Sequence, residues 1–507
     1  MQSWKDFDGD GSRDLAIGVP GETIGVDAAA GGVHVLYGSP GGPTAAGDQF
    51  WNQGSPGVAS NPMPGERFGF AVAAGDFDGD GCGDLVSSAR GQKVSGVSSA
   101  GAVHVLYGTP AGLSGAGSQY WHQDVADILD TPAPAEFFGY DLDTGYLNDD
   151  DYADLAISVL FEGDTGAVAV LYGSPAGLTA SGNELWSQDS PGIRDAGFDC
   201  QSEFFGTSIS IGDYDNDSFG DLAVGVPGED LGDAGGTNCG GAGYLAEAGA
   251  INVIYGSAAG LTAAGDQFLH QNKAGVMGTA GEGDDFGQSL GRGDFDNDGV
   301  VDLAIGVTGE DPAGMSNAGA VNVLYGSGAG LTAAGDQYLH QGTSGVLDAP
   351  DTDESFGFSL VGADFGQSAH ADLAIGVPNE EVLFSGAGAV NVLYGSNAGL
   401  SSAADQFWTQ GSAGVADAAE RDDAFGRDLG RGDYADDGGS DLVIGVPFED
   451  DVGYTEFSGT GAVHVLFGGG ADGLTGAGSQ LWTQGTPGVL EIPEQGDDMG
   501  TVIAGSR

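Results

Sequence analysis

Short apolar segments separated by glycine and proline recur along the whole chain. The segment "LAIGV" at 15–19 is continuously apolar, as expected of a strand that is buried on both faces. The segment "AVHVLYG" at 102–108 alternates, with its histidine pointing away from the valines, and "DQFWNQ" at 48–53 is rich in aromatic residues. Segments of this length and composition predict β-strands, and none has a convincing helical period.

These segments belong to a unit that occurs seven times. Each copy contains an Asp-Leu pair, and the gaps between successive pairs are 70, 70, 67, 81, 70 and 69 residues. In six copies a Phe-Gly pair stands eight residues before an acidic loop; the phenylalanines are Phe68, Phe138, Phe205, Phe286, Phe356 and Phe425. Four strands in each of seven units predict an all-β fold, a seven-bladed β-propeller of four-stranded antiparallel blades.

The two ends of the chain are expected to complete one blade together. Met499-Gly500 stands where the seventh Phe-Gly pair belongs, and "TVIAG" follows as a first strand. Docking of this strand would remove a free sheet edge. We therefore expect one domain over 1–507. Its units are approximately 1–67, 68–137, 138–204, 205–285, 286–355, 356–424 and 425–498, with 499–507 completing the first blade.

Each unit carries an acidic loop after its first strand. In "DFDGDGSRDL" aspartates occupy positions one, three, five and nine, and a glycine allows a tight turn. Calcium takes six to eight oxygen ligands at roughly 2.3–2.6 Å and suits such a carboxylate-rich loop, in which position seven would add a backbone carbonyl. A solvated acidic β-turn is the alternative, since Asp-Gly is common in hairpins. The recurrence of complete copies favours metal.

Four loops have all four aspartates. The predicted ligands, with the residue at position seven included, are Asp6, Asp8, Asp10, Ser12 and Asp14; Asp76, Asp78, Asp80, Cys82 and Asp84; Asp213, Asp215, Asp217, Phe219 and Asp221; and Asp294, Asp296, Asp298, Val300 and Asp302. The third and seventh loops each lack one ligand, and their weaker candidates are Asn148, Asp150, Asp154, Asp433, Asp437 and Asp441. The sixth loop, which starts at Asp364, is expected to bind nothing. The prediction is therefore about four Ca²⁺ ions, and at most six.

Together, the Phe-Gly pairs, the D-x-D-x-D-G-x-x-D-L loops and the Gly-Ala-Val segments resemble the FG-GAP repeats of integrin α-subunit propellers and their bacterial relatives. The resemblance covers essentially the whole chain, and several motifs recur in register. It implies a calcium-stabilised, extracellular propeller. It does not imply integrin function, because one fold hosts many functions.

The charge of the chain restricts its partners. The 507 residues include 75 Asp plus Glu against 12 Lys plus Arg, a formal net charge of −63. Such a field repels nucleic acid and anionic lipid, and it attracts cations and basic partners. Adaptation to high salt would explain the charge without any partner. No apolar run approaches 18 residues, so we expect no membrane insertion. The first residues have no apolar stretch and are not expected to be a signal peptide, which leaves open whether a signal has been removed or the protein is not exported.

Three cysteines do not make a disulfide framework. Cys200 and Cys239 belong to loops that are expected on the same face, so we predict that they can pair in an oxidising compartment. Cys82 lies in a metal loop on the opposite face, without an obvious partner.

No catalytic residues are predicted. Six of the seven histidines occupy repeated positions and are interpreted as structural, and no nucleophile motif or phosphate-binding loop is present. Non-repeated sequence lies in the long 2–3 loop of the fourth unit and in acidic 4–1 loops at 348–355 and 417–424. These loops are either a solvated rim or a surface for a cationic partner or further calcium.

The favoured function is a monomeric binding or adhesion module, extracellular or at the cell surface, for a protein or glycan ligand. The alternative is a polysaccharide-active lyase or hydrolase with its site on a propeller face. A cluster of non-repeated His, Tyr and Arg in one pocket would favour the enzyme.

Overall fold

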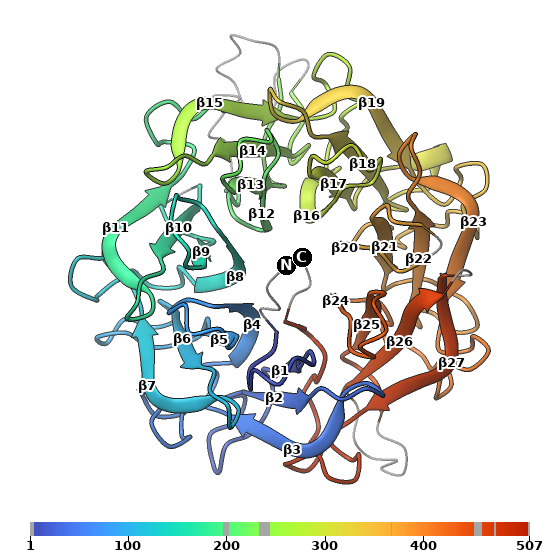
Figure 1. The fold of residues 1–507 in the computed structure, drawn as a ribbon. Helices are drawn as coiled ribbons and strands as arrows, with labels where there is room; N and C mark the ends of the chain where they lie inside the picture. Colours follow the sequence, from blue (N-terminus) through green and yellow to red (C-terminus); the bar gives the residue numbers. More distant parts are fainter. Residues whose placement is uncertain are drawn as a thin grey trace.

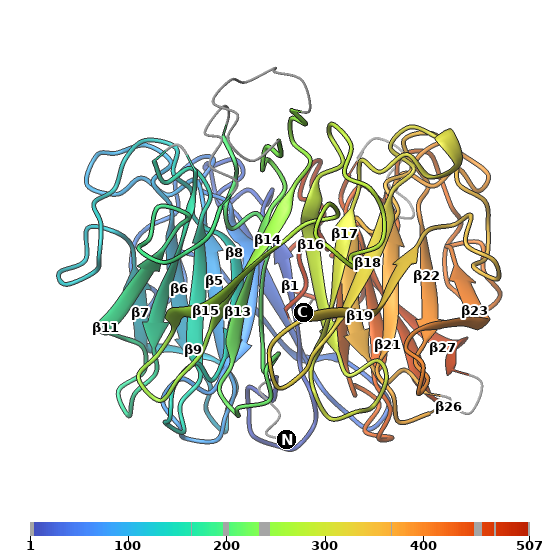
Figure 2. The ribbon, with the colours of Figure 1, turned by 90° about the horizontal axis from the view of Figure 1, so that it is seen from above.

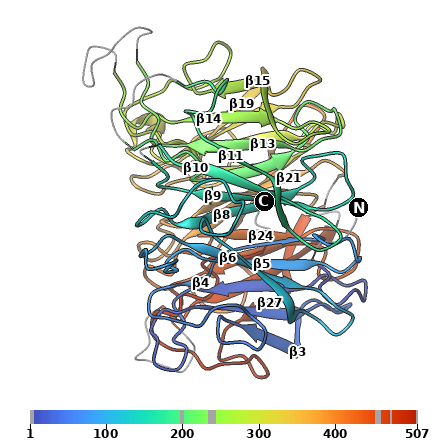
Figure 3. The same cartoon turned by 90° about the vertical axis from the view of Figure 1, so that its left-hand side faces the viewer.

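Seven small β-sheets stand around a common axis (Figure 1). The computed structural model describes residues 5–163, 165–195, 202–232, 244–366, 368–450, 459–470 and 473–504. Seen from the side, the strands run between two faces formed by the connecting loops (Figure 2), and the long outer strands wrap the rim (Figure 3). No helix in the described part of the chain is long and apolar enough to cross a membrane. The predicted all-β, seven-bladed propeller is confirmed.

The blades follow one another in chain order. Blade 1 contains β1 (Leu15–Val19), β2 (Gly32–Tyr37) and β3 (Thr44–Trp51). Blade 2 contains β4 (Phe68–Gly75), β5 (Asp84–Ala89), β6 (Ala102–Tyr107) and β7 (Ser114–Trp121). Blade 3 contains β8 (Phe138–Gly145), β9 (Asp154–Val159), β10 (Ala167–Tyr172) and β11 (Thr179–Trp186). Blade 4 contains β12 (Ile209–Gly212), β13 (Asp221–Val226), β14 (Ala250–Tyr255) and β15 (Thr262–Leu269).

The second half of the chain continues this order. Blade 5 contains β16 (Phe286–Gly293), β17 (Asp302–Val307), β18 (Ala320–Tyr325) and β19 (Thr332–Leu339), with a short 3₁₀ turn, η1 (Pro312–Gly314), between β17 and β18. Blade 6 contains β20 (Ser359–Ala363), β21 (Asp372–Val377), β22 (Ala389–Tyr394) and β23 (Ser401–Trp408). Blade 7 contains β24 (Leu429–Gly432), β25 (Asp441–Val446), β26 (Ala462–Gly470) and β27 (Gly473–Trp482).

Burial within a blade follows the position of each strand. All pairings are antiparallel, and sequential strands are neighbours in every sheet. The second strands, such as β5, are fully buried, whereas the outermost strands, such as β7, are partly exposed. The alternating third strands are also buried at nearly every position, because adjacent blades cover both of their faces. His104, on the polar side of β6, is therefore 0% exposed.

Aromatic side chains fill the spaces between neighbouring blades. The phenylalanine of each Phe-Gly pair is buried, as is Met499 at the seventh position. The residue at position two of each acidic loop is also fully buried, for example Phe7, Phe77 and Tyr214. The apolar positions of the repeat therefore form a ring of cores between blades.

Glycine permits the close approach of blades near the axis. A Cβ atom on Gly18 in β1 would lie 2.2 Å from the carbonyl oxygen of Gly69 in β4. Gly69 itself has a φ of +83°, a conformation that only glycine adopts freely. The Phe-Gly and "AIGV" glycines are thus required by the packing of one blade on the next.

The described part of the C-terminal segment completes blade 1. Gly18 donates its N–H to the carbonyl of Val502 at 2.9 Å, and Ile17 forms an antiparallel bridge with Ile503. Ile503 is 0% exposed. The segment pairs through isolated bridges rather than as a regular strand, and it takes the innermost place that β4 takes in blade 2. This pairing supports the ring closure expected for 499–507.

Candidate metal loops and the opposite face

The acidic loops wrap around their first aspartate. In the fifth loop, both oxygens of Asp294 accept backbone N–H groups, from Asp298 and from Gly299, each at 3.0 Å. Two residues of this loop, Asn297 and Gly299, have positive φ angles of 58° and 95°. These two residues turn the backbone back towards Asp294, so a short loop presents several oxygens to one point.

The carboxylates converge as the sequence predicts. In the first loop, ligand atoms of Asp6, Asp8 and Asp10 lie within 4.8 Å of one another. The same holds for Asp76, Asp78 and Asp84 in the second loop, and for Asp213, Asp215 and Asp217 in the fourth. Burial, reinforced by neighbouring carboxylates, raises the pKa of Asp78. Such a set of hard oxygen donors fits Ca²⁺.

The aspartate at position nine has a structural role in every blade. In the first loop, Asp14 accepts the N–H of Phe7 at 2.7 Å and the N–H of Gly38 at 2.8 Å. The same pair of acceptances recurs at Asp84, Asp154, Asp221, Asp302, Asp372 and Asp441. These aspartates are 0–1% exposed. Each one ties its loop to the end of the third strand, and its role as a metal ligand stays a prediction.

The incomplete loops differ from one another. In the seventh loop Asp433 still accepts N–H groups from Asp437 and Gly438, although Ala435 replaces an aspartate. In the third loop Tyr146 stands at position one, so the loop has no carboxylate around which to wrap.

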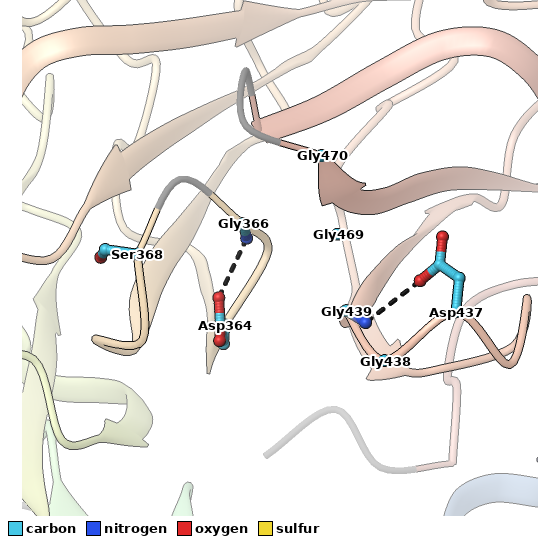
Figure 4. Close-up of a pocket in the computed structure, with 8 residues that line it drawn as sticks. All are labelled: Asp364, Gly366, Ser368, Asp437, Gly438, Gly439, Gly469 and Gly470. Carbon is cyan, nitrogen blue, oxygen red and sulfur yellow. Dashed lines mark hydrogen bonds between the residues drawn. The ribbon is translucent and has the colours of Figure 1, made fainter.

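The sixth loop wraps least around the aspartate at its position one. Among the described residues, the N–H of Gly366 is the one donor to the side chain of Asp364, at 3.1 Å. The sixth and seventh loops line a glycine-rich pocket of about 310 Å³, in which Asp364 and Asp437 each bond to a backbone N–H of their own loop (Figure 4).

The histidines lie where repeated core residues lie. His34, His104 and His464 are fully buried on their third strands, and three other blades have Asn252, Asn322 or Asn391 at this place. Burial lowers the pKa of His104 to about 3, so it packs as a neutral ring. His122, His270 and His340 contact aromatic rings at the ends of fourth strands. Cys82 is buried and free; Cys200 and Cys239 lie outside the described residues.

The face opposite the metal loops has an arginine and aromatic cluster that the sequence analysis missed. The guanidinium of Arg90 lies 3.7 Å from the ring centre of Phe70, and that of Arg427 lies 4.9 Å from the ring centre of Phe358. These contacts are cation–π interactions near the inner strands.

A pocket of about 290 Å³ opens on the same face between blades 3, 4 and 5. Tyr140 and Phe204 provide aromatic walls, and Glu247 and Asp285 provide carboxylates. Burial, with Glu247 as the next cause, raises the pKa of Asp285 to about 7. The pocket combines aromatic surface with negative charge, a combination suited to a cationic group.

A comparison of the seven copies would have found this pocket. Its residues flank the Phe-Gly pairs: Phe204 and Asp285 precede a pair, and Tyr140, Thr207 and Gln288 follow one. At these places the side chains of the seven copies differ in chemistry, and they include aromatic, acidic, basic and neutral polar residues. The Phe-Gly pair fixes the backbone, so its neighbours are free to vary at the centre of the face.

A family model for the FG-GAP repeat matches residues 6–36, 68–106, 205–245 and 286–324. The chain contains FG-GAP repeats. The four matched FG-GAP copies are the first, second, fourth and fifth units, which are the four whose metal loops have all their aspartates. The other three units keep the fold and the position-nine aspartate.

The FG-GAP chain is similar to integrin α-subunits. It is 29% identical over 231 residues to integrin alpha-PS2 of Drosophila melanogaster (44% of this chain, 14% of the relative). It is 29% identical over 260 residues to integrin alpha-V of Gallus gallus (50% and 21%). It is also 30% identical over 172 residues to phosphatidylinositol-glycan-specific phospholipase D of Bos taurus (32% and 19%). The chain thus spans about a fifth or less of the length of these curated relatives.

Among solved structures, the rhamnogalacturonan lyase YesW covers 86% of this chain and 68% of its own, with 13% identity and a TM-score of 0.38. A likeness at this level supports no inference about activity.

Proposed function

We propose that this FG-GAP propeller is a calcium-stabilised, extracellular binding module, and that it contacts a protein or glycan ligand through the face opposite its metal loops. The integrin-like repeats support a binding module. The observation that carries the choice of face is the pocket with Tyr140, Phe204, Glu247 and Asp285. A basic side chain of a protein ligand suits it best, since it offers a cation to carboxylates beside aromatic rings.

The enzyme alternative has less support. Neither histidine nor arginine is among the residues that line this pocket. The pocket therefore offers no acid–base pair of the kind that a non-repeated His, Tyr and Arg cluster would provide.

In this function, calcium would act by stabilising the propeller fold. The predicted ions would neutralise loops in which like charges crowd, and a ligand bound only by the native state stabilises that state. The thermal midpoint should fall when a chelator removes calcium at low ionic strength, where salt does not screen the carboxylates. An unchanged midpoint would remove calcium from the proposal.

The binding surface is tested by variants of the pocket. Displayed peptide and glycan libraries should select ligands in the presence of calcium, with basic side chains enriched among the peptides. The Glu247→Gln, Asp285→Asn double variant should weaken binding at least tenfold. Glu282→Gln, an exposed carboxylate of a neighbouring loop, is the control and should bind normally. Equal binding by the pocket variant and the control would rule out this surface.

A further inference from the structure

A second set of carboxylates lies between the blades, on the face opposite the metal loops. Except in blade 2, the third residue after each blade's second strand is a glutamate: Glu22, Glu162, Glu229, Glu310, Glu380 and Glu449. Each accepts a hydrogen bond from the side chain of a glutamine that ends the fourth strand of the preceding blade, as Gln271 donates to Glu310 at 2.6 Å. We call these places the seams.

A further carboxylate enters the seams from the 4–1 loop. At the first seam it is Asp497, whose charge acts on Glu22; at the fifth it is Asp284, whose charge acts on Glu310. These carboxylates are buried, and Asp497 is 0% exposed. Two or more acidic side chains therefore meet where one blade packs on the next.

Two seams gather three carboxylates each. Ligand atoms of Glu22, Glu494 and Asp497 all lie within 4.8 Å of one another. So do those of a second group: Asp130, Glu136 and Glu162. Among the described residues, neither group forms an ion pair with a lysine or an arginine. The one ion pair of that kind in this part of the chain joins Arg292 to Asp143. Three carboxylates this close require a positive charge or bound protons.

The first seam also contains buried oxygens without a partner. Oδ2 of Asp497 accepts the N–H of Glu494 at 2.5 Å, but Oδ1 has no hydrogen-bond partner in the described part of the chain and is shielded from solvent. Oε1 of Gln484, whose amide nitrogen donates to Glu22, is equally without a partner there. An unsatisfied buried carboxylate oxygen is costly, so its presence beside two other carboxylates points to a missing cation.

The second seam provides an internal comparison. Gln92 stands where six blades have glutamate, and its Nε2 donates to Oε1 of Glu66 at 3.0 Å. Here a neutral amide takes the place of one carboxylate, although Oε2 of Glu66 and Oε1 of Gln53 are also shielded and have no partner in the described part of the chain. The fold therefore accepts glutamine at this position.

We propose that the cluster of Glu22, Glu494 and Asp497 binds a divalent cation. Carboxylate oxygens suit a hard ion such as Ca²⁺ or Mn²⁺. Glu22 follows β1, whereas Glu494 and Asp497 precede the C-terminal segment. The ion would thus connect the two ends of the chain where the ring closes, on the face opposite the FG-GAP metal loops.

The first test counts ions. The full-length protein, loaded with calcium and exchanged into volatile buffer, is weighed by native mass spectrometry. The Glu22→Gln, Asp497→Asn double variant should hold one ion fewer than the wild type. Glu282→Gln, which removes one charge from an exposed side chain, should match the wild type. An unchanged count in the seam variant overturns the proposal.

The second test uses the single variant Glu22→Gln, which copies the natural Gln92 arrangement and should fold. Its thermal midpoint should lie below that of the wild type in calcium, because a ligand is lost. It should lie above that of the wild type in chelator, because carboxylate repulsion is relieved. A rise of equal size under both conditions would show that the cluster shares protons instead of holding an ion.

Discussion

At the scale of single residues, the aspartate at position nine explains why one loop pattern survives in all seven blades. Its carboxylate accepts two buried backbone N–H groups, even in the sixth loop, where positions three and five are no longer acidic. A residue that satisfies two buried donors is needed whether or not a metal binds. A loop can therefore lose its other metal ligands and still keep the aspartate at position nine.

The sixth loop separates these two roles. Asp372→Ala should lower the free energy of unfolding by about 3 kcal/mol, because two buried N–H groups lose their acceptor at about 1–3 kcal/mol each. Asp364→Ala, in the same loop, removes one exposed acceptor and should cost under about 1 kcal/mol. Urea unfolding measures both. Similar losses for the two variants would argue against the structural role of Asp372.

The buried histidines should make the protein sensitive to acid. The pKa of His104 is about 3 in the folded protein, because burial disfavours the charged ring, and about 6.5 in an unfolded chain. Its contribution to stability is thus complete above pH 6.5 and is lost as the pH falls towards 3. At pH 5 the loss is about 2 kcal/mol, from about 1.5 pKa units at 1.36 kcal/mol each.

His104→Asn introduces the residue that three other blades have at this place. It should lose about 2 kcal/mol less than the wild type between pH 7 and pH 5, measured by urea unfolding at each pH. His370→Asn, in the sixth loop, should keep the wild-type slope. If His104→Asn had the same pH dependence as the wild type, the histidine would not be the titrating group.

At the scale of elements, each metal loop is a short connection between the first and second strands of a blade. The left-handed turn residues and the wrap around position one recur in the fifth and seventh loops, although the seventh has lost one carboxylate. Loop shape is therefore set by the backbone and by positions one and nine, and we expect the remaining carboxylates to set the affinity for metal.

The complete and the degenerate loops should differ in metal content. Asp296→Ala removes a carboxylate from the fifth loop and should lower the calcium count of the protein by one, with a lower thermal midpoint in calcium. Asp364→Ala should leave the count unchanged. Native mass spectrometry of both variants provides the comparison, and equal losses would contradict the ranking of the loops.

At the scale of the whole molecule, stability depends on closing the ring. Each blade buries its apolar surfaces against two neighbours, and blade 1 obtains its innermost chain segment from the other end of the sequence. Ile503 and Met499 are fully buried in this joint. An open ring would expose the edge of β1 and the apolar surface beside it.

Deleting residues 499–507 should therefore cause aggregation or a large loss of stability. Ile503→Ala is the graded companion and should cost about 2–4 kcal/mol, as expected for a buried isoleucine. Size-exclusion chromatography and thermal melting measure both. A truncated protein that stays monomeric and melts like the full chain would show that the ring closes in another way.

The sequence by itself determined the architecture. Apolar segments with period two, bounded by glycine and repeated seven times, allow few structures other than a ring of small antiparallel sheets. The positions of the acidic loops followed as well, because ligand spacing within ten residues is a local property. Repetition also identified most histidines as core residues, since a side chain that recurs in several blades has a structural role within the blade.

Only the tertiary structure decided what lies between blades. Glu22 and Asp497 are 475 residues apart (497 − 22), and they meet because the ring brings the two ends of the chain together. Tyr140 and Asp285 likewise line one pocket although they belong to different blades. Contacts of this kind depend on how one sheet packs on the next, and no pattern within a single repeat specifies them.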